Sequence, residues 1–380
     1  MALNTFQIID TTLREGEQFL NANFTTDDKI AIAEALSEFG VEYIEVTSPY
    51  VSPKSRDDCL RLSRLNLSSK LIAHTRCHIE DVKVALDAGV EGLNMTIGIS
   101  PFLRRYSHKK SIDEIVTIVI DLLNYINKVA PDIEIRFSGE DTFRTAQADI
   151  VKVYQKVIQT GHIKRIGLAD TVGKAEPDQV FEMVRSIREM TDMDIEFHGH
   201  NDTGCAVANA YFAIKAGATH IDTSILGIGE RNGITPLESF IARIYTVNSE
   251  IIQSKYKIKT LLALSKLVAD ILGEPIPFNQ CLIGKTAFTH KAGIHTNATL
   301  MNPETYEIFK PEDFGMKRQI LLNHKLVGWH AVQNRALELG IKLDADNARV
   351  ITKNIKSLAD EKTIELSDID EMLINSKHNI

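Results

Sequence analysis

Two histidines stand two residues apart in the stretch IEFHGHND, residues 195–202, where an apolar run ends. If the run is a β-strand, His198 and His200 share one of its faces, because side chains alternate between the two faces. Two imidazoles on one face can bind a common metal ion, and a carboxylate can complete a three-ligand set with open positions. The alternative is a solvated strand tip that is rich in histidine. Other reactive side chains must converge on the pair to favour the metal site.

The candidate carboxylate is Glu15, in the stretch TTLREGEQF that follows the first apolar run. Arg14 precedes it, and an Arg-Glu pair of this kind also fits a capped loop that carries a solvated charge pair. Beside a metal ligand, however, the arginine would suit an α-keto acid. The ion would hold the ketone and carboxylate oxygens, and the guanidinium would donate two hydrogen bonds to the carboxylate.

Two further stretches place polar side chains on a single strand face. IEIRFSGE does so with Arg136, Ser138 and Glu140, and LIAHTRCH does so with His74, Arg76 and His78. Strands of an ordinary barrel would direct aliphatic side chains inward. His74 also fits a core histidine with a satisfied hydrogen bond, and Arg76 is interpreted as structural. The repetition indicates that several strands direct polar groups toward one site.

The elements that must position these side chains are short β-rich runs that alternate with helical patterns. The helical pattern of residues 25–40 opens on a capping threonine and closes on Gly40. The runs cover residues 6–10, 41–48, 71–76, 92–98, 133–140, 163–171, 194–201 and 219–226. Eight β-rich runs, each followed by room for a helix, predict an α/β fold, a (β/α)₈ TIM barrel of roughly 250 residues. Its active site is expected at the carboxyl ends of the strands. A doubly wound open sheet is the alternative, but TTLREGEQF is not the glycine-rich loop that a dinucleotide-binding sheet requires.

The strand rhythm is lost from about residue 250. TLLALSKLVADILG predicts a helix, and a loop-like segment rich in His, Gly and Asn and two further amphipathic helices follow it. We therefore expect a mostly helical C-terminal region after the barrel. The predicted division is a catalytic barrel over 1–260, a linker or lid over 261–315 and a helical subdomain over 316–380.

The composition excludes several classes of protein. The 380 residues carry a net charge of −8, which argues against nonspecific binding to nucleic acid. No apolar run approaches the roughly 18 residues of a membrane helix, and the first residues do not read as a signal peptide. The four cysteines are scattered, which favours a reducing compartment over a disulfide framework. These features together predict a cytoplasmic protein.

Six motifs then carry a specific resemblance: DTTLREGEQF, RFSGED, GLADTVG, HGHND, SILGIGERNGITPLE and FTHKAGIH, in this order. Together they resemble the isopropylmalate synthase/homocitrate synthase family of metal-dependent barrel acyltransferases. LREGEQF, RCH, LRRYSH, GERNGITPL and NPETYEI are similar to the lysine-pathway homocitrate synthase branch of that family. Gly233-Ile234 stands where sister enzymes have Gly-Asn, so a fourth, asparagine, metal ligand is not expected.

The resemblance implies a Claisen condensation of acetyl-CoA with 2-oxoglutarate, followed by thioester hydrolysis to homocitrate and CoA. It also implies a divalent metal ion, Zn²⁺, Mg²⁺ or Mn²⁺. The implied metal ligands are Glu15, His198 and His200. The residues implied to hold the keto acid are Arg14, Gln18, His74, Arg136, Ser138 and Thr171, with Arg104 pairing with the distal carboxylate. The implied general base is His295, and its helpers are Glu140 and Tyr306.

Several of these positions have a plainer interpretation from the residues alone. His295 reads as a loop residue and Tyr306 as a packing residue. The glycines of GIGERNG, residues 227–233, would fit a phosphate cradle. That stretch lacks the lysine and serine of such loops, so it is interpreted as a turn that supports the site.

The resemblance also implies partners and regulation. Family members are domain-swapped homodimers in which the C-terminal region covers the partner's barrel. Lysine feedback is expected to be weak here, because Asn94 stands where lysine-sensitive relatives carry an aspartate. Glu196 is the other candidate partner for the lysine ammonium. Three functions remain open: a homocitrate-forming acyltransferase, a sister enzyme for another keto acid such as oxaloacetate, pyruvate or 2-oxoisovalerate, and a metal-dependent aldolase or lyase on the same barrel.

Overall fold

The computed structural model describes residues 6–376, and the chain forms two compact units that divide between Ile276 and Pro277. The sequence placed the first division at residue 260. The difference arises from the helix Leu261–Leu272, α11, which packs against α1 of the barrel unit. A further division of the second unit at residue 315 stays a prediction.

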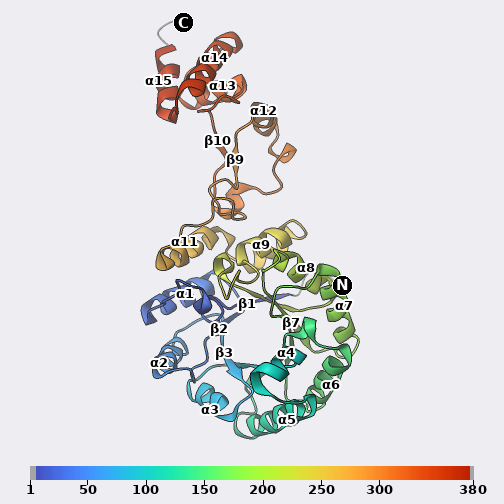
Figure 1. Cartoon of the computed structure of the whole chain (residues 1–380). Coiled ribbons are helices and arrows are strands. Elements are labelled where there is room, and N and C mark those ends of the chain that lie inside the picture. The colour runs from blue at the N-terminus through green and yellow to red at the C-terminus, as the bar shows by residue number, and fades with distance from the viewer. Residues whose placement is uncertain (1–5, 377–380) are drawn as a thin grey trace. The chain divides into compact units, whose positions relative to one another are not determined.

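The first unit is a closed barrel of eight parallel strands that follow one another in sequence order (Figure 1). The strands are β1 (Gln7–Asp10), β2 (Tyr43–Val46), β3 (Lys70–Arg76), β4 (Gly92–Gly98), β5 (Glu134–Glu140), β6 (Arg165–Asp170), β7 (Asp194–Gly199) and β8 (His220–Thr223). The ring closes because β8 pairs with β1, from Gln7 beside His220 to Asp10 beside Thr223. The predicted (β/α)₈ barrel is therefore confirmed, and the open sheet is wrong.

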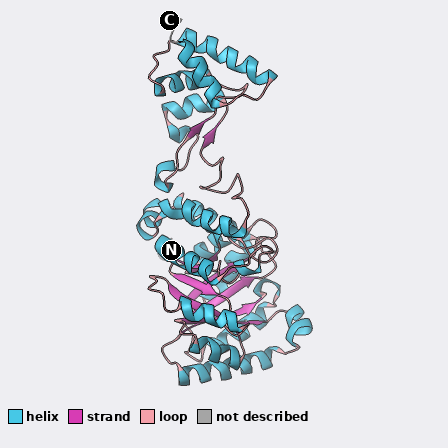
Figure 2. Cartoon of the chain, turned by 90° about the vertical axis from the view of Figure 1, so that its left-hand side faces the viewer, coloured by secondary structure: helices cyan, strands magenta, loops and turns pink. Residues whose placement is uncertain are grey.

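Helices surround this ring, as the side view in Figure 2 shows. They are α1 (Thr26–Phe39), α2 (Pro53–Leu62), α3 (Ile79–Asp87), α4 (Pro101–Leu103), α5 (Ile112–Val129), α6 (Gln147–Ile158), α7 (Pro177–Arg188), α8 (Ala206–Ala216), α9 (Leu237–Tyr245), α10 (Ser249–Lys255) and α11. The capping signals in the sequence set the ends of α1. Thr25 and Asp28 form a capping box at its start, and Gly40 ends it at φ 107°, a backbone conformation that favours glycine.

Alternation along the strands separates an aromatic and aliphatic outer face from a charged interior. On β5, Phe137 points outward and its ring lies 6.0 Å from the ring of Tyr154 on α6. Arg136, the residue before it, is buried inside the barrel and pairs with Glu196 of β7. Arg165 of β6 also pairs with Glu196, at 2.7 Å. The interior of this barrel is therefore partly a layer of paired charges, where aliphatic side chains are usual.

The second unit is mostly helical. It contains the short parallel pair β9 (Thr289–His290) and β10 (Gln319–Ile320), and the helices α12 (Gly293–Met301), α13 (Trp329–Glu338), α14 (Ala345–Glu361) and α15 (Leu366–Ser376). Buried aliphatic residues of α13, α14 and α15 form its core. Two expectations need correction. The segment expected as a loop contains helix α12, and three helices follow it where two were expected.

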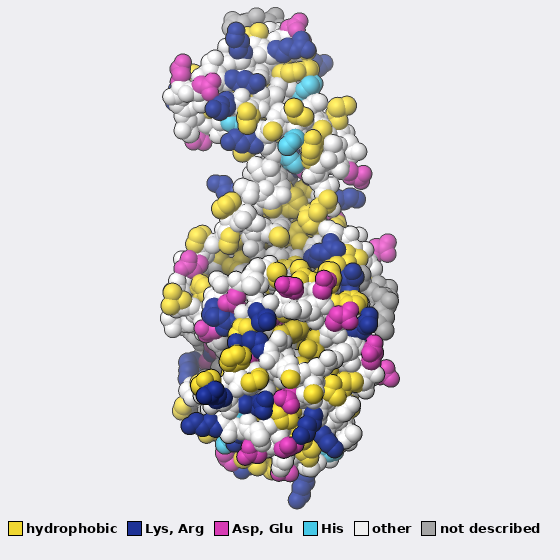
Figure 3. All heavy atoms as spheres, turned by 45° about the vertical axis from the view of Figure 1, so that its right-hand side comes forward, with side chains coloured by type: hydrophobic (Ala, Val, Ile, Leu, Met, Phe, Trp, Pro, Cys, Tyr) yellow, Lys and Arg dark blue, Asp and Glu magenta, His cyan; other side chains and the backbone are white. Residues whose placement is uncertain are grey.

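The surface of the face shown in Figure 3 carries Lys and Arg side chains interspersed with Asp and Glu over the barrel unit. All four cysteines are free. Among residues 6–376, no helix combines the length and the apolar character needed to cross a membrane.

Candidate active site

A cavity of about 220 Å³ opens at the carboxyl ends of the barrel strands. It brings together the predicted metal ligands, Glu140, and every predicted keto-acid residue except Arg104. The residues that line it are Arg14, Glu15, Gln18, His74, Thr96, Arg136, Ser138, Glu140, Ala169, Thr171, His198, His200, Glu230 and Arg231. The face shared by alternate strand residues thus becomes the wall of one cavity.

Glu15, His198 and His200 form a buried cluster in this cavity. One ligand atom from each side chain lies within 4.8 Å of those of the other two. Glu15 arrives from the turn after β1, while His198 lies on β7 and His200 lies just past its end. Two imidazoles and a carboxylate, with space on one side, match a three-ligand metal site with open positions.

The ionisation of the cluster suits a cation. Burial lowers the pKa of His198 and of His200 to about 4, so both imidazoles are neutral at pH 7 and each offers a nitrogen lone pair. Burial, the largest single effect, opposes ionisation of Glu15. Arg14, the two histidines and the backbone N–H of Glu230 together outweigh it and lower the pKa of Glu15 to about 2. The donor set is therefore two neutral nitrogens and an anionic oxygen, which fits a divalent ion.

Arg14 is held in place by a residue that the sequence analysis missed. Its Nε donates to Glu45 of β2 at 2.8 Å, and it also pairs with Glu15. Glu45 is 1% exposed and also accepts a hydrogen bond from Asn94 at 2.8 Å. His74 Nδ1 lies 3.4 Å from the same carboxylate. The sequence did hold a signal for Glu45, because it is an acidic residue in the middle of the apolar run VEYIEVTS.

Arg136 crosses the barrel interior over a glycine. The Nη2 atom of Arg136 lies 2.5 Å from Oε1 of Glu196. A Cβ at Gly167 of β6 would lie only 2.4 Å from Nε of Arg136, so a larger residue there would displace the guanidinium of Arg136. Ser138 lines the cavity two residues further along β5 and donates to the carbonyl of Gly167 at 3.2 Å. The predicted keto-acid residues of β5 therefore face the cavity from one strand.

The remaining predicted residues of the first unit fall into two groups. Gln18, Glu140 and Thr171 line the cavity. Burial raises the pKa of Glu140 above its ordinary value. Arg104 begins the five-residue π-helical turn Arg104–His108 and does not line the cavity. Its Nη2 pairs with Asp149 of α6 at 3.2 Å. Arg104 must leave Asp149 before it can bind a substrate carboxylate.

The stretch GIGERNG supports the metal carboxylate. The backbone N–H of Glu230 donates to Oε1 of Glu15 at 2.9 Å. Arg231 makes two hydrogen bonds of 2.9 Å to Asp202 and one of 2.8 Å to the carbonyl of Thr171. These contacts fit the interpretation of the stretch as a supporting turn. Glu230 and Arg231 also line the cavity, which the sequence analysis did not predict.

His295 and Tyr306 belong to the second unit. His295 lies on α12, and the centroids of the His295 and Tyr306 rings are 4.4 Å apart. The pair predicted to act on the acetyl group is therefore assembled within that unit. Its catalytic role stays a prediction.

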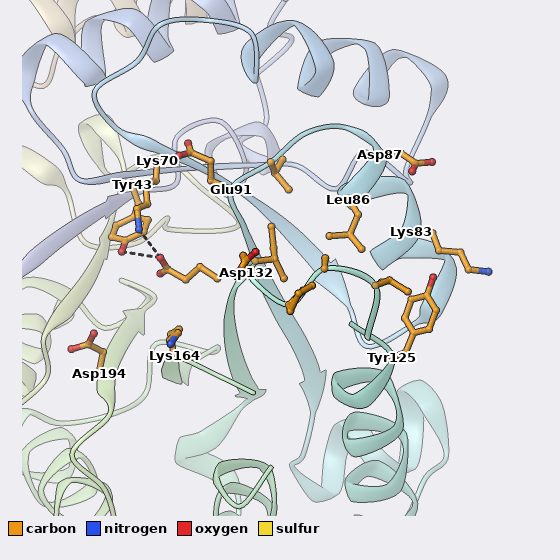
Figure 4. A pocket seen from close by; sticks show the side chains of 16 residues that line it. Tyr43, Lys70, Lys83, Leu86, Asp87, Glu91, Tyr125, Asp132, Lys164 and Asp194 are labelled. Atoms are coloured by element: carbon orange, nitrogen blue, oxygen red, sulfur yellow. Dashed lines mark hydrogen bonds and ion pairs between the residues drawn. The ribbon is translucent and has the colours of Figure 1, made fainter. Parts of the chain in front are cut away.

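A larger cavity, of about 1130 Å³, lies at the opposite, amino-terminal end of the barrel strands and contains none of the predicted site residues (Figure 4). In it, the hydroxyl of Tyr43 and the ammonium of Lys70 both donate to the carboxylate of Glu134, at 3.3 and 2.9 Å. Because barrel enzymes carry their chemistry at the carboxyl ends of the strands, the smaller cavity is the candidate active site.

Two family profiles match the chain. Residues 5–268 match the HMGL-like family, and residues 282–363 match the homocitrate synthase post-HMGL domain-like family. A hydroxymethylglutaryl-CoA lyase structure from Bacillus subtilis superposes with a TM-score of 0.63 at 22% identity. That likeness covers 96% of the lyase but 72% of this chain, and it shows the fold alone.

Curated relatives cover nearly the whole chain. The mitochondrial homocitrate synthase of Schizosaccharomyces pombe is 50% identical over 98% of this chain and 88% of the relative. The cytosolic homocitrate synthase isozyme of Saccharomyces cerevisiae is 48% identical over 98% of this chain and 86% of the relative. The 2-isopropylmalate synthase of Methanocaldococcus jannaschii is 34% identical over 96% of this chain and 70% of the relative.

These names correct one prediction and establish the family. The expectation of a cytoplasmic protein is wrong by this comparison, because relatives of this similarity, including a second one from Saccharomyces cerevisiae, are mainly named mitochondrial. Unpaired cysteines indicate a reducing compartment but do not distinguish one such compartment from another. The profile matches and the two homocitrate synthases of about half identity show that the chain belongs to the homocitrate synthase family, on an HMGL-like barrel.

Proposed function

We propose that this chain condenses acetyl-CoA with 2-oxoglutarate and hydrolyses the thioester, which yields homocitrate and CoA. The observation that carries the proposal is the single cavity in which Glu15, His198 and His200 stand beside Arg14 and Arg136. A cation site next to two guanidinium groups is complementary to an α-keto acid, whose ketone and carboxylate oxygens are adjacent. The names of the similar proteins support the product.

The keto acid is bound by residues of the barrel. A divalent ion on the three ligands, Zn²⁺, Mg²⁺ or Mn²⁺, would polarise the ketone as a Lewis acid. Arg14 is oriented for this task by Glu45, and it reaches the cavity beside Glu15. Ser138 and Thr171 supply hydroxyl groups to the same cavity. The cavity of about 220 Å³ suits a small dicarboxylate.

Carbon–carbon bond formation needs a base, because the α-proton of a thioester is weakly acidic. We assign that base to His295, with Tyr306 and Glu140 as its helpers, on the family resemblance. His295 takes a proton from the acetyl methyl group, and the enolate carbon attacks the ketone carbon of 2-oxoglutarate. The ketone oxygen gains a proton, and water then cleaves the thioester to a carboxylate and the CoA thiol.

We further propose a homodimer in which the C-terminal region of one chain serves the barrel of its partner. The support is the family resemblance, together with exposed apolar side chains on the second unit. Ile294, Met301 and Ile308 are 81%, 81% and 75% exposed in the single chain. Large apolar side chains left this exposed in a single chain are typical of residues that a partner covers.

A panel of keto acids tests the proposed function. Thiol release from acetyl-CoA is measured with 2-oxoglutarate, oxaloacetate, pyruvate and 2-oxoisovalerate at equal concentration. We expect 2-oxoglutarate to be the preferred acceptor. Faster turnover of 2-oxoisovalerate would contradict the proposal.

The same assay tests Arg104. Arg104→Ala should raise KM for 2-oxoglutarate, since a cation is needed for the distal carboxylate. Arg105→Ala is the matched control, because Arg105 stacks on Tyr106 at 5.1 Å and lies next to Arg104 in the same turn. An unchanged KM in Arg104→Ala would show that Arg104 does not bind the distal carboxylate of 2-oxoglutarate.

A further inference from the structure

Asp222 of β8 contacts one of the two candidate histidine ligands. Its Oδ2 lies 2.9 Å from Nδ1 of His198. The contact follows from the strand register, because β7 and β8 pair with Glu196 beside His220 and Phe197 beside Ile221. Continuing that register places Asp222 next to His198. Both side chains are buried, with Asp222 1% exposed.

We propose that Asp222 is a positioning residue that fixes the ring of His198 for metal binding. A neutral imidazole carries one N–H, and the nitrogen that keeps it is set by the hydrogen bond of the other nitrogen. The carboxylate of Asp222 accepts the Nδ1–H of His198. Nε2 is then left without a proton, and the ring orientation presents it to the cavity that also contains Glu15 and His200. Metal-binding histidines are commonly oriented by a carboxylate in this way.

The surroundings of Asp222 argue against a purely structural role. Glu196, a neighbouring buried carboxylate on β7, is paired with both Arg136 and Arg165. Asp222 forms no ion pair with a lysine or arginine among residues 6–376, and its Oδ1 has no hydrogen-bond partner there. Burial of an incompletely paired carboxylate is unfavourable. An aliphatic side chain at this strand position would serve the fold better, so the acid is best explained by its contact with His198.

The two candidate histidine ligands differ in whether a carboxylate holds the Nδ1 atom of the ring. Nδ1 of His200 has no hydrogen-bond partner in the described part of the chain. His198 is therefore the ligand whose ring is held in advance, and His200 is the more adaptable one. Loss of Asp222 should weaken metal binding but should not abolish it, because all three ligands remain.

Metal titration of the full-length protein tests the inference, which rests on the proposed metal site. Metal-stripped wild type, Asp222→Asn and Asp222→Ala are titrated with Co²⁺, and the affinity and the visible absorption spectrum of the bound ion are recorded. We expect Asp222→Ala to bind Co²⁺ about 10–100-fold more weakly, with an altered spectrum. Asp222→Asn keeps an acceptor oxygen and should show a smaller loss.

Asp10→Asn is the matched control. Asp10 lies on β1 beside Thr223, is fully buried, and bonds the N–H of Thr12 and the hydroxyl of Thr223 rather than a candidate ligand. Its substitution should leave Co²⁺ affinity and spectrum unchanged.

The inference is overturned if both Asp222 variants bind Co²⁺ as the wild type does, or if Asp10→Asn weakens binding equally. If Asp222→Ala fails to fold, the test is the Co²⁺ affinity of Asp222→Asn compared with that of Asp10→Asn. A wild type that does not bind Co²⁺ would overturn the proposed metal site itself, together with this role of Asp222.

Discussion

Glu15 has an orientation that depends on a neighbouring glycine. A Cβ at Gly229 would lie 2.9 Å from Cγ of Glu15, closer than real side chains approach. The backbone of the next residue, Glu230, then donates to Oε1 of Glu15. The glycine thus allows the loop after β8 to approach the candidate metal carboxylate closely.

We expect Gly229→Ala to displace Glu15 and to reduce bound metal and activity together. Bound metal is measured by atomic emission on purified protein, and activity by thiol release. Gly161→Ala is the control, because a Cβ there would meet no atom within 4 Å. Equal metal content in the wild type and Gly229→Ala would show that the loop does not determine the position of Glu15.

Asn94 is also tied to the charges of the site. Its amide donates to Glu45 at 2.8 Å, while its Oδ1 has no hydrogen-bond partner among the described residues. Asn94→Asp would place two buried carboxylates side by side, an arrangement that favours a nearby cation.

We therefore expect weak inhibition of the wild type by lysine and inhibition several-fold stronger in Asn94→Asp, since a charge-assisted hydrogen bond adds about 1 kcal/mol. The measurement is a lysine titration at subsaturating 2-oxoglutarate. Tight inhibition of the wild type that the substitution leaves unchanged would show that another residue governs it.

At the scale of elements, the barrel was predictable because its signals are local. Capping residues and alternating strands marked α1 and β5, and the parity of β5 predicted correctly that Arg136 and Ser138 face one cavity. Contacts between distant strands were not predictable in this way. Glu45 was missed because its partners are distant in sequence: Arg14 lies in the turn after β1, and Asn94 lies on β4. Helix α12 was missed because glycine and histidine in HKAGIH have low helix propensity, which packing within the second unit overrides.

The ion pairs between strands make a measurable contribution to the barrel. Arg165 is 2% exposed and joins three strands, through Glu196 on β7 at 2.7 Å and Glu134 on β5 at 2.8 Å. Arg165→Met leaves both carboxylates without this partner. We expect a loss of about 3–5 kcal/mol in the free energy of unfolding.

Urea denaturation followed by circular dichroism measures that loss. Arg185→Met is the matched control, because Arg185 is exposed on α7 and its pairs lie at the surface. Surface pairs contribute about 0–1 kcal/mol, so the control should unfold near the wild-type midpoint. Equal midpoints for both variants would mean that the interior charges do not stabilise the barrel.

At the scale of the whole molecule, the proposed swapped dimer predicts complementation between two inactive chains. His198→Ala lacks a candidate metal ligand, and His295→Ala lacks the candidate base. In a swapped heterodimer of the two, one of the two sites keeps both residues. Co-expressed chains with two different affinity tags, purified as the heterodimer, should therefore regain about half of the wild-type activity. A heterodimer as inactive as either parent would exclude the swap.

The account depends most on the claim that the cavity of Glu15, His198 and His200 binds the metal ion that the condensation requires. The direct measurement is CoA release from acetyl-CoA and 2-oxoglutarate by metal-stripped protein, followed as Zn²⁺, Mn²⁺ or Mg²⁺ is added and the bound metal is counted. The account predicts no activity in the stripped protein. Activity should then return with at least one of these ions, in proportion to binding of one ion per chain. Full activity in protein that contains no measurable metal would contradict it.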